Sequence, residues 1–179
     1  MEDYAYVLDV LPEGRPDSKR RFRREAVVYG LGIEEFKIFD MKPVPGAAIN
    51  IGDRCYIGKE TEERTQIDHV RARVNFVELT HTAQSELGFV LDDIVKENEE
   101  KFIQFYNHAG PISRRYHSLE LIPGLGKKTM NLIVSNRPYS TFDEMEEKIP
   151  NFRNPEKYIS QRIESEIKES DQKYRLFVR

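Results

Sequence analysis

With 179 residues, this chain can form one large or two small domains, and its composition of 33% charged and 39% hydrophobic residues is that of a globular protein. A single cysteine, Cys55, excludes an internal disulfide, and the four scattered histidines have no zinc-ligand spacing. No apolar run approaches the length of a membrane span, and the first residues lack the basic start of a signal peptide, so we expect a cytoplasmic protein with no membrane contact.

The basic residues are concentrated in two islands, although the net charge of the chain is −3. Residues 15–24 carry six basic side chains against one acidic side chain, and residues 108–137 carry five against one. Local excesses of this kind can orient a polyanion such as nucleic acid even when the total charge is negative. The first island, taken alone, is also compatible with a solvated loop.

The first 79 residues have the pattern of short strands separated by turns. We expect strands at residues 4–10, 26–31, 35–41 and 70–76, and a strand, a glycine turn and a strand across residues 49–58. In the last strand, apolar side chains alternate with Arg71 and Arg73, which would share the open face of the sheet. This pattern predicts a small OB-like β-barrel over residues 1–79, with an SH3-like barrel as the alternative.

From residue 80 the apolar spacing becomes that of helices. We expect a helix at residues 82–97 and a second one that Asn98 caps and that ends at residue 107. Another is expected to start at a capping box at residues 141–144, and a last helix starts with Asn154 and Pro155. The tail at residues 174–178 is expected to add a strand to the barrel. The predicted fold class is therefore α+β, with the barrel followed by an all-α domain over residues 80–179.

Residues 119–134 predict two short helices joined by a tight glycine turn. Leu119 and Ile122 before the turn, and Met130, Ile133 and Val134 after it, recur at helical spacing and are expected to pack across it. A P-loop is excluded, because the residue five positions before the Gly–Lys pair is a leucine rather than a glycine.

The turn itself predicts an anion site. Pro123 cannot continue the first helix, whereas Gly124 and Gly126 allow backbone torsions and close approaches that a side chain would block. The second helix then begins with free amides at the positive end of its dipole, and Lys127 and Lys128 add charge, so we expect a phosphate there. A purely structural turn that touches no ligand is the alternative.

The run of residues 122–128, in which hydrophobic residues alternate with glycines before two lysines, resembles the helix-hairpin-helix motif, whose members bind nucleic-acid backbones. The resemblance implies that the amides of Gly124, Gly126 and Lys128 face phosphate oxygens. It also implies a bound monovalent cation on three backbone carbonyls, those of Glu120, Ile122 and Leu125. Residues 141–167 repeat the architecture without the glycines, which gives a tandem unit.

Over nearly its full length the chain also resembles an archaeal conserved-hypothetical family of predicted RNA-binding proteins. The basic residues at 20–24 and the run at 117–128 carry this likeness. It implies that RNA is a more probable ligand than DNA, and it implies a role in translation or ribosome biogenesis with ribosomal or RNA-processing partners.

These features predict a sequence-nonspecific nucleic-acid-binding protein rather than an enzyme. The candidate binding residues are Arg20, Arg21, Arg23, Arg24, Arg71, Arg73, Arg114, Arg115, Gly124, Leu125, Gly126, Lys127, Lys128 and Thr129. The arginines at 20–24 are expected to form one electropositive face with Arg71 and Arg73. The alternatives are a DNA-binding repair or nuclease-associated protein, although the acidic residues form no recognisable catalytic metal set, and a protein-interaction scaffold.

Overall fold

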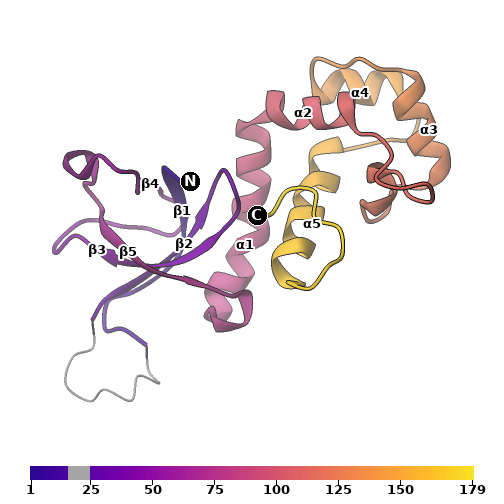
Figure 1. Ribbon diagram of the computed structural model, residues 1–179. Helices are drawn as coiled ribbons and strands as arrows, with labels where there is room; N and C mark the ends of the chain where they lie inside the picture. The colour runs from indigo at the N-terminus through magenta and orange to yellow at the C-terminus, as the bar shows by residue number, and fades with distance from the viewer. Residues whose placement is uncertain (16–24) are drawn as a thin grey trace. The chain divides into compact units, whose positions relative to one another are not determined.

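The computed structural model describes residues 1–15 and 25–179. The chain divides into two compact units, one of Met1–Val90 together with Glu166–Arg179 and one of Leu91–Ser165. In the described part of the chain, the strands belong to the first unit, and the second unit is built from helices and their connections (Figure 1). The predicted mixture of strands and helices is confirmed.

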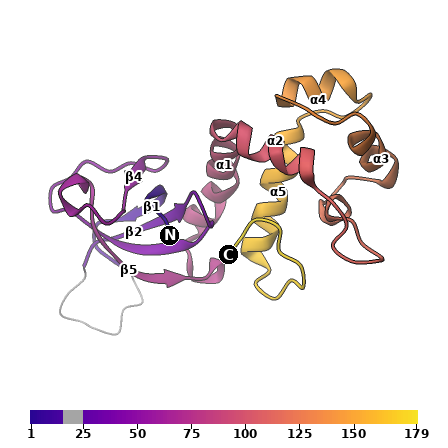
Figure 2. The ribbon, with the colours of Figure 1, turned by 45° about the horizontal axis from the view of Figure 1, so that its top comes forward.

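The first unit contains a five-stranded antiparallel sheet that curls into a half-barrel (Figures 1 and 2). Its strands are β1 (Tyr4–Leu11), β2 (Val27–Gly32), β3 (Ile38–Pro43), β4 (Arg54–Tyr56) and β5 (Ile67–Val74). They are arranged in the order β4-β1-β2-β3-β5, so β4 returns to lie beside β1. Short 3-10 helices, η1 (Thr61–Glu63) and η2 (Phe76–Glu78), flank β5.

Both faces of the sheet bury apolar side chains. One face forms a core cluster of Ala5, Val7, Val28, Met41, Cys55, Ile57 and Ile67. On the opposite face, the intervening residues of β1 and β2 are also buried, Tyr6, Leu8 and Tyr29 among them. Burial on both faces explains why β1 and β2 are almost continuously apolar instead of alternating with polar residues.

Two predicted strand segments differ in the structure. Residues 49–51 are not a strand, and the third strand begins at Ile38, because a turn precedes it in which Phe36 has a φ of 58°. The buried carboxylate of Glu2 accepts hydrogen bonds from the amides of Glu34 and Glu35, each at 2.7 Å, and so holds this turn. The amides of Glu34 and Glu35 thus bond to a side-chain carboxylate instead of to the backbone of a neighbouring strand.

The tail does not form the predicted strand. The carboxylate of Glu166 is 1% exposed and accepts hydrogen bonds from the amides of Leu176, Phe177 and Val178 at 2.6, 3.0 and 2.9 Å. Because these three amides already donate to the carboxylate, they are not available to a neighbouring strand. A buried acid therefore fixes the last residues within the first unit.

The described residues contain five α-helices: α1 (His81–Glu97), α2 (Glu99–His108), α3 (Lys127–Ser135), α4 (Phe142–Lys148) and α5 (Pro155–Lys168). The 3-10 helix η3 (Ser118–Leu121) precedes α3, where an ordinary helix was predicted. The predicted starts of α4 and α5 are confirmed, and the hydroxyl of Thr141 accepts the amide of Glu144 at 3.1 Å. None of the described helices is long and apolar enough to cross a membrane.

The second unit has its own apolar core. The members that surround the predicted hairpin are Leu119, Ile122, Leu125, Ile133, Tyr139, Phe142, Met145, Ile149, Phe152, Ile159 and Ile163. The prediction that Val134 packs in this seam is wrong, because its side chain is 40% exposed. Leu125, the last residue of the turn, is buried.

Candidate functional site

The turn between η3 and α3 has a conformation that requires its glycine. The carbonyl of Ile122 accepts a hydrogen bond from the amide of Leu125 at 3.2 Å, and Gly124 between them has a φ of 81°. Proline at the second position and a positive φ at the third are the features of a type II turn. Pro123 and Gly124 therefore fix the direction in which the chain enters α3.

The first turn of α3 leaves its amides uncovered. Gly126 is the N-cap, and its own lack of a side chain leaves the cap without a side-chain acceptor. The first helical bond runs from the amide of Met130 to the carbonyl of Gly126 at 2.9 Å. Within the described part of the chain, the amides of Lys127, Lys128 and Thr129 donate to no acceptor.

The space in front of these amides is open. Gly126, Lys127 and Lys128 are exposed, and a Cβ added to Gly126 would meet no atom within 4 Å. The first turn of α3 contains no acidic residue, and neither lysine pairs with a carboxylate of the described residues. The amides, the helix dipole and the two ammonium groups thus provide complementary positive charge for an anion.

Residues distant in the sequence hold the segment before the turn. Arg162 of α5 is 7% exposed and donates from Nη1 to the carbonyl of Leu121, the last residue of η3, at 2.9 Å. At the other end of η3, Nδ1 of His117 accepts the amide of Leu119 at 3.1 Å, and the Glu120 carboxylate accepts the amide of His117 at 2.8 Å. The sequence patterns did not single out Arg162 or the His117 cap.

The environment of His117 favours its neutral imidazole. Burial lowers the pKa of His117 below its usual value of 6.5, and the positive charge of Arg137 lowers it further, against an opposing effect of Glu120. A neutral ring is also what the hydrogen bond requires, because Nδ1 must be unprotonated to accept an amide proton.

A second turn repeats the first in the same unit. Residues 149–152 read Ile-Pro-Asn-Phe, and the amide of Phe152 donates to the carbonyl of Ile149 at 3.4 Å. Asn151 has a φ of 60°, which corresponds to the positive φ of the glycine in the first turn. Asparagine is among the residues that tolerate this torsion, so the lost glycine does not prevent the turn.

The second turn differs from the first because a carboxylate lies at the start of the helix that follows it, α5. The carboxylate of Glu146 accepts the amide of Asn154 at 2.7 Å and lies 3.7 Å from the guanidinium of Arg153. The following residue, Pro155, has no amide proton to offer. The backbone amide of Asn154 therefore already donates to the Glu146 carboxylate, whereas the first amides of α3 have no acceptor among the described residues.

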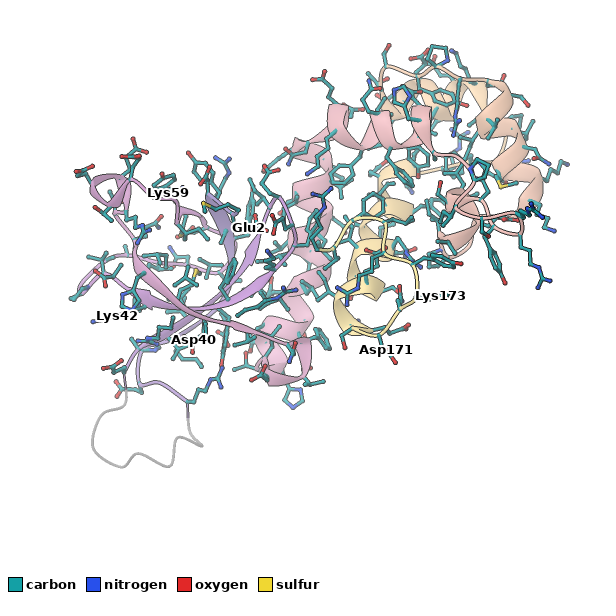
Figure 3. All side chains as sticks on the ribbon, in the orientation of Figure 1. Glu2, Asp40, Lys42, Lys59, Asp171 and Lys173 are labelled. Carbon is teal, nitrogen blue, oxygen red and sulfur yellow. The ribbon has the colours of Figure 1, made fainter. Side chains whose placement is uncertain are left out.

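The basic residues of the first unit are in different surroundings. Arg71 donates to the carboxylates of Asp40 at 3.2 Å and Glu25 at 3.3 Å, and to the carbonyl of Ala26 at 2.8 Å. Figure 3 labels Asp40 and Lys42 on β3, which pairs with β5. The charge of Arg71 is therefore largely compensated by its two acidic partners.

The predicted alternation along β5 is interrupted. A register shift at Asp40 and Met41 makes Ala72 exposed and leaves Arg71 only partly exposed. Arg73 is exposed, and its guanidinium donates to the backbone oxygen of Arg179 at 3.2 Å. Arg20, Arg21, Arg23 and Arg24 lie outside the described residues, so their common face with the β5 arginines stays a prediction.

Of the three carbonyls that the resemblance assigns to a monovalent cation, that of Glu120 lies in η3, and those of Ile122 and Leu125 lie in the turn that follows. The carbonyl of Ile122 already accepts the amide of Leu125, and a cation would use its remaining lone pair. The cation stays a prediction. Across the described residues, no group of three or more His, Cys, Asp or Glu side chains is arranged to hold a metal ion.

Comparison with known proteins gives three consistent matches. A family model described as "Protein of unknown function (DUF655)" matches residues 1–179. The uncharacterized protein MJ0038 of Methanocaldococcus jannaschii is 42% identical over 182 residues, which cover 99% of this chain and 80% of that protein. The crystal structure of Af1531 from Archaeoglobus fulgidus has a TM-score of 0.91 and 38% identity, and covers 99% of this chain and 100% of that one. The predicted likeness to an archaeal family is confirmed.

Proposed function

Since the chain belongs to the DUF655 family, we propose from its geometry that it binds nucleic acid without reading base sequence, with RNA preferred over DNA. The observation that carries this proposal is the start of α3. Three consecutive amides have no acceptor within the described part of the chain, and two unpaired lysines flank them on an open surface. A phosphate would accept from the amides and gain the charge of the lysines, with no contact to a base edge.

The two turns of the second unit support the helix-hairpin-helix interpretation. Each is an Ile-Pro turn closed by a backbone hydrogen bond, with a positive φ at its third residue and a helix after it. The first copy presents free amides, and the second covers its amide with the Glu146 carboxylate. We therefore assign phosphate binding to the first copy and packing to the second.

The strand order of the first unit supports the OB-like interpretation. The sequence β4-β1-β2-β3 across the sheet is the order of a Greek key, and the OB-fold is a partly open, five-stranded Greek-key barrel. OB-folds bind oligonucleotides partly through the loop between their first two strands. In this chain the basic residues at 15–24 lie between β1 and β2 in the sequence.

A place in translation or ribosome biogenesis, with ribosomal or RNA-processing partners in the cytoplasm, extends the proposal and rests on the likeness to predicted RNA-binding proteins. Phosphate contacts do not depend on base sequence and fit an RNA or a DNA backbone alike, so the preference for RNA rests on the same likeness.

The proposal is tested by replacing Lys127 and Lys128 together with alanine. Folding should be nearly unchanged, since exposed substitutions alter the free energy of unfolding by about 0.5 kcal/mol or less. Binding of single-stranded RNA, duplex RNA and duplex DNA, measured by fluorescence anisotropy at several salt concentrations, should weaken for every sequence. The slope of log affinity against log salt should become shallower by about 1.4 to 1.8, because each of the two lost phosphate contacts removes about 0.7 to 0.9.

A matched control replaces Lys59 and Lys173, two exposed lysines of the first unit that Figure 3 labels, with alanine. This variant has the same net charge as the hairpin variant, so it measures the effect of total charge alone. If both double variants lower affinity and slope equally, or neither does, α3 is not the phosphate site.

A further inference from the structure

The loop between α2 and η3, which we call the arginine loop (residues 111–117), is ordered by its own hydrogen bonds. Pro111 and His117 form an isolated β-bridge, and the amides of Ile112 and Ser113 donate to the carbonyl of Tyr116 at 2.8 and 3.2 Å. The hydroxyl of Ser113 in turn accepts the amides of Arg115 and Tyr116, both at 3.2 Å. The loop therefore presents its side chains from a defined backbone.

The arginine loop exposes the ring of Tyr116 beside the guanidinium groups of Arg114 and Arg115. Tyr116 is 49% exposed and Ile112 is 37% exposed, although both are large apolar side chains in a unit with a well-filled core. Arg114 and Arg115 are exposed, and their guanidinium groups pair with no carboxylate of the described residues. A half-exposed tyrosine and two exposed arginines thus lie together on one short loop.

The loop is connected directly to the proposed phosphate site. It ends at His117, which caps η3, and η3 leads through the type II turn into α3. Both ribbon views show this part of the chain next to α3 (Figures 1 and 2). Because His117 and Arg162 fix the two ends of η3, the loop and the amides of α3 are held by one continuous, well-supported segment.

We infer that the arginine loop is a stacking platform for an unpaired nucleobase, with Tyr116 as the stacking ring and Arg114 and Arg115 as contacts for the adjoining phosphates. Proteins that bind single strands combine these two elements, a cationic surface for the backbone and aromatic rings for the bases. The inference rests on the proposed function and narrows it. The ligand is single-stranded or locally unpaired nucleic acid, because the bases of a duplex are already stacked on one another.

The test compares two oligonucleotides of equal length, a single-stranded RNA and an abasic sugar-phosphate strand that keeps every phosphate but lacks the bases. The wild-type protein should bind the abasic strand roughly tenfold more weakly, since one base–aromatic stack contributes on that order. Tyr116→Ala should bind the RNA about tenfold more weakly than wild type, with an unchanged salt slope, and should bind the abasic strand as well as wild type does. Tyr116→Phe should behave like wild type towards both strands.

Phe89→Ala serves as the aromatic control, because Phe89 is 68% exposed and belongs to the other unit. It should leave both affinities unchanged. The inference is overturned if wild type binds the two strands equally, or if Tyr116→Ala weakens binding to both strands by the same factor. An unfolded Tyr116→Ala variant would leave the wild-type and Tyr116→Phe comparisons to decide.

The same measurements separate this inference from the proposed function. If the Lys127 and Lys128 double variant loses affinity and salt slope while Tyr116→Ala binds RNA as wild type does, the phosphate site stands and only the stacking platform is wrong. If the lysine variant binds unchanged, the proposed function fails whatever Tyr116 does.

Discussion

The guanidinium of Arg162 donates to the backbone carbonyl of Leu121 at 2.9 Å, across 41 residues of sequence. Leu121 is the last residue of η3, so no further turn of helix donates to its carbonyl. Arg162 therefore satisfies an acceptor that would otherwise lack a hydrogen bond next to the turn. Because Arg162 is almost completely buried, the bond also fixes where the turn lies on α5.

We expect Arg162→Ala to lower the free energy of unfolding by about 2–3 kcal/mol, since a buried hydrogen bond from a charged group is lost and its acceptor is left unsatisfied. Chemical denaturation measures this change. Arg153→Ala is the control, because Arg153 is largely exposed and its ion pair with Glu146 spans 3.7 Å, so its loss should cost no more than about 0.5 kcal/mol. Equal costs for the two variants would show that the bond to Leu121 contributes little.

The two glycines of the first turn should respond differently to substitution. Gly124→Val should destabilise the protein by about 1–3 kcal/mol, because a β-branched residue is strained at a φ of 81° and its Cβ would lie 3.4 Å from the ring of Tyr158. Gly126→Ala should cost at most about 1 kcal/mol, since its φ of −79° suits any residue and the added methyl meets open space.

Affinity distinguishes these two variants further. In the proposed complex, the methyl group of Gly126→Ala would stand near the α3 amides that bind the phosphate, so RNA affinity should fall about tenfold although the fold is kept. Thermal denaturation and anisotropy on the same samples provide the comparison. Unchanged affinity in Gly126→Ala would mean that no ligand approaches these amides closely.

His117 should make stability depend on pH below neutrality. Its folded pKa lies below the usual 6.5, so the folded state binds the proton less readily than the unfolded state. The stabilising effect of the neutral ring is complete above about pH 6.5 and is lost as the pH falls below that value. Physically, a protonated Nδ1 becomes a donor that faces the amide of Leu119.

The melting temperature of wild type and of His117→Asn, followed from pH 8 to pH 5, tests this expectation. Asparagine can still cap η3 but does not titrate, so the variant should lose less stability than wild type on acidification. The lowered pKa values of Glu35, Asp68 and Glu144 affect a more acidic range and should not obscure the difference. Parallel curves for the two proteins would contradict the prediction.

Cys55 should be chemically inert in the folded protein. Burial raises the pKa of its thiol to about 11, with a smaller contribution from Asp53, and the side chain is completely inaccessible. The thiolate, which is the reactive form, is therefore scarce at pH 8 and shielded from reagents. A thiol-specific chromogenic reagent should react slowly with the native protein and rapidly in 6 M guanidinium, and fast native reaction would refute the burial argument.

The sequence by itself determined the features that depend on a few neighbouring residues. Pro123 and Gly124 predict a tight turn because proline and glycine restrict or permit particular torsions, and the structure has a turn there, of type II. The capping residue Thr141 likewise marks the start of α4. The exposed lysines of α3 were also foreseen, since their charge and position in the first helical turn are local properties.

Only the tertiary structure decided which side chains satisfy distant backbone groups. Glu146 covers the amide of the second turn, Arg162 supports the first, and Glu166 binds the tail that was expected to form a strand. The sequence also did not predict the register shift in β5 that places Arg71 beside Asp40. A local pattern specifies torsions and periodicity, whereas the partner of a buried polar group depends on which segments folding brings together, and sequence spacing does not contain that information.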